Sequence, residues 1–277
     1  MTTSTWTCAR QELSLSVRSQ WTQIFSVVFA VLALAVAASG YVLSGGYGFQ
    51  DFARTAASLL QLVLLLVPLA ALLFGVITFT PDRGSAELLY SQPVSRYAVV
   101  GGQLLGAFLA LVGAQAIGFG AAGLVIFTQS GAEGVSGFLG VMAGSAALTA
   151  IFLGLAAAIS AGDTTDRRAR NLAIALVIWF GAVVLFDVAV LGVASLLPSG
   201  LASRVLIVST LVNPIDAART STLLAVEGKT AFGSGSLAFL RFTGGPAGAA
   251  AWLGASIVAW TALPLIAAGI RVRRSDI

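Results

Sequence analysis

The chain has 277 residues, of which 58% are hydrophobic and 9% are charged, and its formal net charge is +4. A soluble domain carries roughly 25% charged residues, so this composition excludes an ordinary soluble protein and indicates an integral membrane protein. The apolar stretches are continuous, reach about 20 residues and lack the alternation of a barrel strand, which predicts membrane-spanning helices.

Six apolar stretches are long enough to span a bilayer. The third and fourth exceed the minimum length, which allows a tilt or a projection beyond the membrane. We therefore expect an all-α integral membrane protein with one transmembrane domain over residues 1–277 and with spans at about residues 24–44, 59–79, 98–127, 135–160, 172–197 and 247–270.

The first apolar stretch has two interpretations. Arg10 and Arg18 precede it, and Ala35-Val36-Ala37 within it resembles the small-residue site of a cleaved signal peptide. The stretch continues through Leu43 to full spanning length, and the leading segment is long for a signal peptide. These two features favour a retained span.

The basic residues predict the orientation of the chain in the cell membrane. With the N-terminus inside, ten of the fifteen Lys and Arg residues lie in cytoplasmic segments, where positive charge is retained. Both termini are therefore expected in the cytoplasm, and attraction to anionic lipid explains the net charge without a nucleic-acid partner. The ten are Arg10, Arg18, Arg83, Arg96, Arg167, Arg168, Arg170, Arg271, Arg273 and Arg274.

Residue types that common catalytic and metal sites need are scarce. The chain has no His, one Cys (Cys8) and only Met1 and Met142 as methionines. Transition metals bind imidazole, thiolate or thioether ligands, so we expect this chain to bind no metal or other cofactor by itself. Asp187 is the one carboxylate clearly within a predicted span, whereas an aspartyl protease in the membrane needs two. We therefore expect no catalysis in the bilayer.

Two glycine-containing patterns look like nucleotide motifs and are better explained otherwise. Gly228-Lys229-Thr230 lacks the earlier glycine of a phosphate-binding loop, since Leu occupies position 223. The GxGxxG match at residues 118–123 lies inside a span, not after a strand. Small residues spaced in this way let membrane helices approach closely, and the same prediction holds for Gly102-x-x-x-Gly106 and Gly140-x-x-x-Gly144.

A polar segment separates the second predicted span from the third. Residues 79–106 read FTPDRGSAELLYSQPVSRYAVVGGQLLG. Thr80 is placed to cap a helix that has Pro81 at its first position, and Pro93 ends that helix. Ser95 is then placed to cap the third span. We predict a short cytoplasmic helix at about residues 81–91 that presents apolar surface to a partner protein. An interfacial helix in the lipid headgroups is the alternative.

The residue order of this segment resembles a known family. GSAELLYSQPVSR at residues 84–96, followed by GGQLLG at 101–106, resembles the signature of ABC-2 type permeases. The resemblance implies an ABC-2 (type V exporter-like) transmembrane domain whose coupling helix, within residues 80–96, docks on a separate ATPase subunit that holds ATP and Mg. Ala86 stands where the family usually has a larger apolar residue. The implied docking residues are Asp82, Arg83, Gly84, Glu87, Leu88, Leu89, Pro93 and Arg96.

Two later segments, residues 172–192 and 211–219, look like the permease subunit of the ABC transporter for nitrous oxide reductase maturation. That resemblance implies a homodimer of the permease, a cargo such as a sulfur species for copper–sulfide cluster assembly, and an extracytoplasmic maturation protein as a partner. A generic ABC-2 exporter of lipid, drug or peptide is the main alternative. A non-transporting membrane scaffold is a further one.

Asp187 is expected in the outer part of the fifth span. A carboxylate there costs about 2.5–3.5 kcal/mol on insertion scales and normally faces protein or a wet cavity. Two roles are open for it, which are a place in the cargo path and a polar contact that steadies the permease dimer.

The outer loop at residues 198–246 is too long for a simple connection. Residues 201–212 are apolar enough to dip into the outer membrane face, and Asn213-Pro214 breaks this stretch. Asn213, Asp216 and Arg219 are candidate contacts for an outer partner protein, although a solvated loop also carries such side chains.

Overall fold

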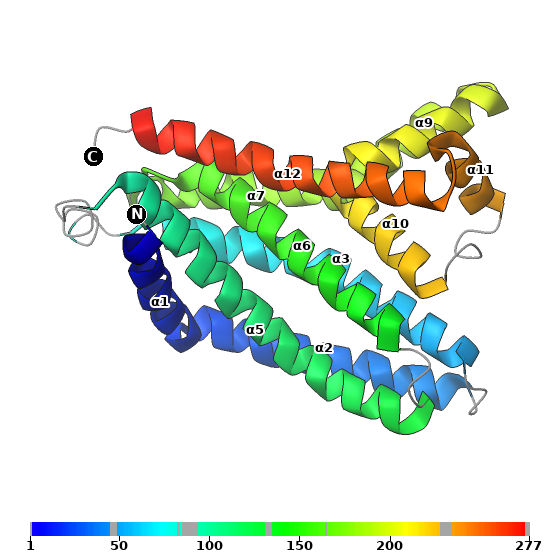
Figure 1. The fold of residues 1–277 in the computed structure, drawn as a ribbon, viewed down its shortest axis with the longest axis horizontal. Helices are drawn as coiled ribbons and strands as arrows, with labels where there is room; N and C mark the ends of the chain where they lie inside the picture. Colours follow the sequence, from blue (N-terminus) through cyan, green and yellow to red (C-terminus); the bar gives the residue numbers. More distant parts are fainter. Residues whose placement is uncertain are drawn as a thin grey trace.

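The computed structural model describes residues 2–44, 49–81, 84, 94–130, 135–163, 165–227 and 234–274, and the regular structure in these ranges is helical. The long helices run along the longest axis of the molecule, and α1 begins and α12 ends at the same end (Figure 1). The elements are α1 (Thr2–Arg18), α2 (Gln20–Ser44), α3 (Phe49–Phe79), α5 (Arg96–Ser130), α6 (Val135–Ser160), η1 (Thr165–Arg167), α7 (Arg168–Phe180), η2 (Gly181–Leu185), α8 (Phe186–Ser195), α9 (Ser199–Val212), α10 (Pro214–Glu227), α11 (Ser234–Thr243) and α12 (Pro246–Arg274).

Six helical segments in the described ranges are long and apolar enough to cross a membrane, and each overlaps one of the six predicted ranges. The fifth consists of η1, α7, η2 and α8 in succession. A helix pair, α9 and α10, adds a broken or re-entrant segment that bends by 98°. The candidate spans are Gln20–Ser39, Thr55–Phe79, Arg96–Thr128, Val135–Ser160, Thr165–Ser195 and Pro246–Arg273.

The centre of the bundle consists of α3, α5 and α6. Between 50% and 56% of the residues in the most apolar part of each of these helices are buried, compared with 22% in α2, 17% in α12 and 6% in the α7–α8 segment. Edge-to-face aromatic pairs join α2, α5 and α6, with ring centroids of Phe29 and Phe119 5.2 Å apart and those of Phe119 and Phe138 5.9 Å apart. The outer helices therefore face their surroundings along most of their length.

A buried polar network also joins α5 to α6. The Gln115 side-chain amide donates to the Thr149 hydroxyl over 2.8 Å, and the Ser145 hydroxyl donates to the Gln115 carbonyl oxygen over 2.7 Å. Apolar helices gain little from burying one another in lipid, so such bonds help to decide which faces meet.

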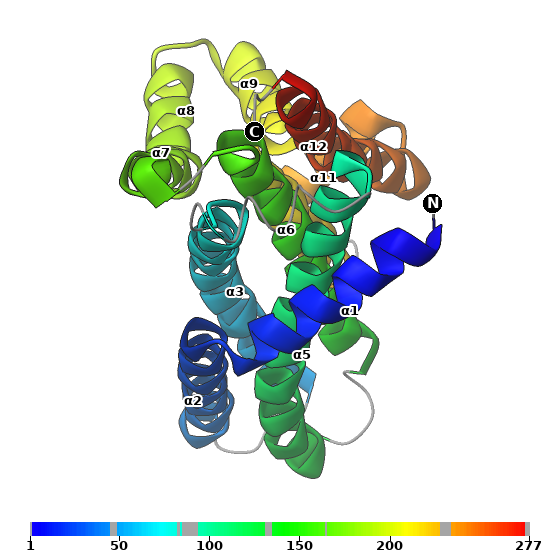
Figure 2. The same cartoon turned by 90° about the vertical axis from the view of Figure 1, so that its left-hand side faces the viewer.

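The N-terminal helix α1 lies across the start of α5 (Figure 2). A Cβ atom built at Gly102 would be 2.4 Å from the Cβ of Cys8, and one at Gly106 would be 2.6 Å from the Ala9 carbonyl oxygen. The prediction that Gly102 and Gly106 permit close packing is confirmed, and their partner is the polar helix α1, not another span.

The first part of the predicted outer loop forms two helices, α9 and α10. Asn213 separates them with an extended backbone, φ −90° and ψ 123°, because the following Pro214 disfavours helical geometry at that position. Gly140 and Gly144 of α6 face α10, since a Cβ atom built at Gly144 would be 2.5 Å from the Thr222 hydroxyl. The predicted break at Asn213-Pro214 is thus confirmed, and α10 packs into the bundle.

The tight contact of α1 with α5 gives a test with a matched control. Gly106→Ala places a methyl group against backbone atoms of α1, and overpacking of this kind costs about 1–3 kcal/mol. Gly113→Ala, on the same helix, meets no atom within 4 Å and gains up to about 1 kcal/mol from helix propensity. We expect the first change to lower and the second to keep or raise the unfolding midpoint of the detergent-purified protein. Shifts in the same direction for both would contradict the packing described.

Candidate functional site

The predicted coupling segment lies mostly outside the described residues. Of its implied docking residues, Gly84 and Arg96 fall inside them, where Gly84 is exposed and Arg96 opens α5. Ser95 caps α5 as predicted, because its hydroxyl accepts a hydrogen bond from the Ala98 N–H over 3.2 Å. The other predicted docking residues, Asp82, Arg83, Glu87, Leu88, Leu89 and Pro93, lie outside the described residues.

A polar cluster, here called the inner clamp, lies where α6 turns into α7. Its centre is the carboxylate of Asp163, whose side chain is 4% exposed. The Arg271 guanidinium from the end of α12 donates to Oδ2 over 2.7 Å, and the Asn171 amide donates to the same oxygen over 2.9 Å. Arg170 and Arg167 each reach the carboxylate over 3.1 Å. One acidic side chain thus joins α6, α7 and α12.

The environment of Asp163 favours its charged form. Burial acts to raise the pKa of this carboxyl, but the Asn171 hydrogen bond and the charges of Arg271 and Arg167 outweigh that effect. The pKa therefore lies below its ordinary value of 3.8. At neutral pH the carboxylate is fully ionised and holds its donors.

A second part of the inner clamp binds the end of α3. The Arg168 guanidinium donates to the Thr80 carbonyl oxygen over 2.6 Å and to the Thr80 hydroxyl over 3.2 Å. The Thr165 N–H and hydroxyl both donate to the Pro81 carbonyl oxygen over 3.2 Å. The α6–α7 turn therefore binds the backbone of the first two residues of the predicted coupling segment, Thr80 and Pro81.

A second polar cluster, here called the outer junction, lies about midway along α12 and the α7–α8 segment and contains four of the predicted site residues, Asp187, Asn213, Asp216 and Arg219. The Asn213 amide donates to the Ala182 carbonyl oxygen over 2.9 Å and to Asp216 Oδ2 over 3.1 Å. Asn213 Oδ1 accepts from the Ile215 N–H over 3.1 Å and so caps α10. Ala182 lies in η2, a π-helical turn, and such turns open the helical hydrogen-bond ladder and often occur at functional sites.

Arg219 connects Asp187 to this junction. Its guanidinium is 3.2 Å from Asp216 Oδ1 and 3.4 Å from Asp187 Oδ2, so it joins α10 to α8. Asn213 is 3% exposed and Asp216 is 6% exposed, which leaves them little surface for a partner protein. The structure thus brings Asp187, Asn213, Asp216 and Arg219 into one cluster.

The outer junction borders a cavity of about 450 Å³. Its walls come from α8, α9, α10 and α11 and combine Asp187, Asp216 and Arg219 with the hydroxyls of Ser203 and Thr210 and with apolar side chains. Two carboxyl groups and one guanidinium are thus the ionisable groups in the wall of this cavity.

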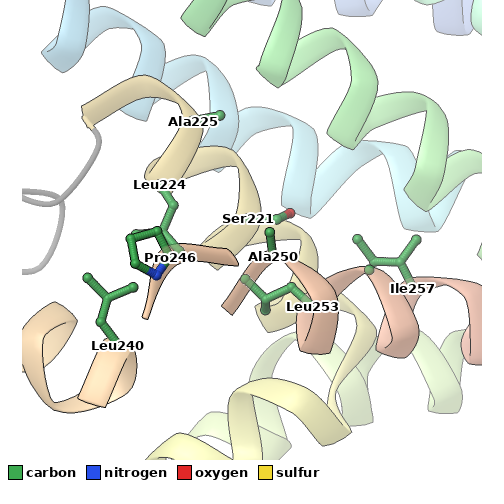
Figure 3. A pocket seen from close by; sticks show the side chains of 9 residues that line it. Ser221, Leu224, Ala225, Leu240, Pro246, Ala250, Leu253 and Ile257 are labelled. Carbon is green, nitrogen blue, oxygen red and sulfur yellow. The ribbon is translucent and has the colours of Figure 1, made fainter. Parts of the chain in front are cut away.

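A second cavity, of about 420 Å³, lies between α10, α11 and α12 (Figure 3). Leu224, Leu240, Leu253 and Ile257 contribute to an almost wholly apolar lining. The hydroxyl of Ser221 also borders it and donates to the Ala218 carbonyl oxygen of its own helix. This cavity offers no charged group to a ligand.

Sequence reasoning missed the inner clamp. The signal was present in part, because Asp163 precedes Arg167 by four residues and Arg170 by seven, which is the spacing of one helical face. The pairing with Arg271 and the hold of Arg168 on Thr80 had no local signal, since the partners are far apart in the chain. Among the described residues no group of three or more His, Cys, Asp or Glu side chains could hold a metal ion.

Comparison with known proteins gives the family of this multi-pass membrane protein. Residues 6–277 match the family described as ABC-2 family transporter protein, and the chain belongs to that family. It is an ABC transporter permease, a membrane subunit without catalytic chemistry of its own.

Two relatives carry the name Probable ABC transporter permease protein NosY. The one from Pseudomonas aeruginosa is 34% identical over 266 residues, which cover 94% of this chain and 95% of the relative. The one from Stutzerimonas stutzeri is 34% identical over 231 residues, which cover 80% of this chain and 82% of the relative. The similarity thus extends over nearly the whole chain.

The charge of Asp163 gives a prediction with a defined pH dependence. Asp163→Asn removes the negative charge and one of the two acceptor oxygens that three arginines share, and we expect a loss of about 1–3 kcal/mol of unfolding free energy at neutral pH. Because the folded-state pKa lies below the ordinary 3.8, the contribution is complete above that value and is lost as the pH falls through the folded-state pKa. Unfolding of both proteins in detergent across this range measures the difference.

Asp166→Asn is the matched control, because that side chain is exposed and lies three residues further on. We expect a much smaller effect for it. Equal losses in the two variants, or a difference from the parent that persists unchanged in strong acid, would contradict the role given to Asp163.

Proposed function

We propose that this chain is the permease subunit of an ABC-2 transporter that serves nitrous oxide reductase maturation. The observation that carries this proposal is the 34% identity to NosY-named permeases along 94% of the chain. Within the ABC-2 family, a generic exporter of lipid, drug or peptide is the competing function, and the similarity over nearly the whole chain favours the maturation role.

The proposed assembly has two copies of this chain, each with an ATPase subunit docked at residues 80–96. ATP and Mg bind to the ATPase subunits, and ATP binding draws the two coupling segments together. The motif at residues 84–96 supports this docking. The inner clamp supports it as well, because Arg168 and Thr165 bind the backbone of Thr80 and Pro81.

The proposed orientation places the inner clamp, α1 and the end of α12 on the cytoplasmic side, with the outer junction further toward the outside. Ten of the fifteen basic residues belong to segments at this proposed inner end, in agreement with the retention of positive charge on the cytoplasmic side. An extracytoplasmic maturation protein would meet the outer end of the molecule, where α9 and α11 lie (Figure 1).

The proposed cargo is a sulfur species or another factor for copper–sulfide cluster assembly. A chain with no His, one Cys and two Met offers few ligands for copper itself. The outer junction carries two carboxylates against one guanidinium, which disfavours an anion. We therefore assign Asp187 the role of holding α8 to α10 through Arg219, and not the role of a cargo ligand.

Deletion of the gene in its own host tests the maturation role. We expect nitrous oxide reductase purified from the deletion strain to lack its copper–sulfide cluster and its activity, and we expect both to return when the gene is restored. Copper content and nitrous oxide reduction are the measurements. A fully loaded reductase in the deletion strain, or a host without the reductase, would contradict this role and favour the generic exporter.

Charge reversal at Glu87 tests the docking of the ATPase. Glu87→Lys places a positive charge in the segment that the family resemblance assigns to the ATPase groove, and we expect the ATPase to be lost from the purified complex. Glu227→Lys is the matched control, because Glu227 ends α10, which lies toward the other end of the molecule (Figure 1). Retention of the ATPase by the Glu87 variant would refute the assigned role.

A further inference from the structure

Two helices connect the inner clamp to the outer junction. The first is α7 with η2, which begins at Arg168 in the inner clamp and contains Ala182, the acceptor of the Asn213 amide. The second is α12, in whose last turn Arg271 binds Asp163 and the Ala161 carbonyl oxygen. Both helices therefore have hydrogen-bonded attachments to the same turn at one end of the bundle.

At its other attachment, α12 binds the last carbonyl oxygens of α9. The Ser256 hydroxyl donates to the Leu211 carbonyl oxygen over 2.6 Å, and the Trp260 indole N–H donates to that of Val212 over 2.9 Å. These carbonyls directly precede Asn213, whose side chain binds Ala182 of η2. The bend between α9 and α10 is consequently held from two sides, by η2 and by α12.

The connecting stretches are suited to transmit a displacement. The helix from Arg168 to Ala182 is about 21 Å long, and that from Trp260 to Arg271 is about 16 Å long, at the usual helical rise. Only 6% of the residues in the most apolar part of the α7–α8 segment are buried, and Leu172, Ile178 and Val183 are among the partly buried side chains that pack against the core. The Trp179 indole N–H adds a hydrogen bond to the Leu65 carbonyl oxygen of α3 over 3.1 Å.

The inner clamp and the outer junction hold different parts of the chain. At the inner end, Arg168 and Thr165 bind Thr80 and Pro81, which are the first two residues of the proposed ATPase-docking segment. At the outer junction, the 98° bend at Asn213 sets the angle between α9 and α10, which both line the charged cavity. The helix formed by α7 and η2 connects the end of α3 to Asn213 at this bend.

We propose that Arg168 and Asn213 are positioning residues for transport, which couple movement of the ATPase-docking segment to opening of the cavity at Asp187, Asp216 and Arg219. Arg168 moves α7 together with the end of α3, and Asn213 transfers that movement from η2 to the bend between α9 and α10. This inference rests on the proposed docking of an ATPase at residues 80–96.

The experiment measures access to the cavity from a single introduced thiol. Cys8 is the one cysteine of the chain, so Cys8→Ser gives a cysteine-free background, and Ser203→Cys places a thiol in the cavity wall. The purified permease–ATPase complex is treated with a charged maleimide, with and without a non-hydrolysable ATP analogue. We expect the analogue to change the labelling rate by about tenfold, as when a two-state equilibrium moves from mostly closed to mostly open.

Two variants test whether Arg168 and Asn213 couple the docking segment to the cavity, and two further variants serve as a conservative replacement and a control. Arg168→Ala removes both bonds to Thr80, and Asn213→Ser removes the amide that binds Ala182 while it keeps a side-chain oxygen to cap α10. We expect both to abolish the effect of the ATP analogue on labelling, and we expect Arg168→Lys to restore part of it. Arg273→Ala, an exposed arginine near the end of α12, is expected to keep the full response.

Each outcome decides a separate point. A nucleotide response that persists in Arg168→Ala and Asn213→Ser overturns the positioning role and leaves the ATPase docking intact. Loss of the ATPase from these complexes also overturns it, since the residues then act on docking instead of transmission. A parent complex that binds ATPase but shows no nucleotide response refutes the coupling, whereas a parent that binds no ATPase refutes the proposed function.

Discussion

A single buried carboxylate holds one end of this bundle together. Lipid is as apolar as the helix surfaces, so apolar faces alone do not select their neighbours in a membrane protein. Asp163 makes that selection for α6, α7 and α12, because its two oxygens bind one amide and three guanidinium groups. A buried charge is costly unless its hydrogen bonds are satisfied, so an arrangement without these donors is disfavoured.

The same demand for satisfied polar groups governs the bend at Asn213. A helix cannot be interrupted inside or beside the hydrocarbon layer unless the freed backbone groups find partners. Ser256 and Trp260 bind the carbonyl oxygens that α9 leaves at its end, and Asn213 itself caps α10. The interruption is therefore built into the packing of α12 and η2, and α12 and the α7–η2 helix also connect it to the inner clamp.

Local patterns in the sequence predict the spans, the cap at Ser95, the break at Asn213-Pro214 and the close packing at Gly106, because each depends on neighbours a few residues away. The pairs Asp163–Arg271 and Asp187–Arg219 join residues that are distant in the chain, and no periodicity announces them. The π-helical turn at Ala182 also has no sequence marker, since an outside donor stabilises it. Charge in the predicted outer loop indicated contact with a partner protein or with solvent, whereas the fold pairs these side chains within the chain.

The position of α1 has a consequence for the order in which the chain assembles. Its main neighbour is the start of α5. The face of α1 that packs against Gly102 and Gly106 therefore has no partner helix until the ribosome has made roughly 90 residues more. At about 5–20 residues per second, that delay lasts on the order of 5–20 seconds. The N-terminal helix therefore stays without its partner helix while the first two spans insert. It docks on α5 once the start of the third span has been made.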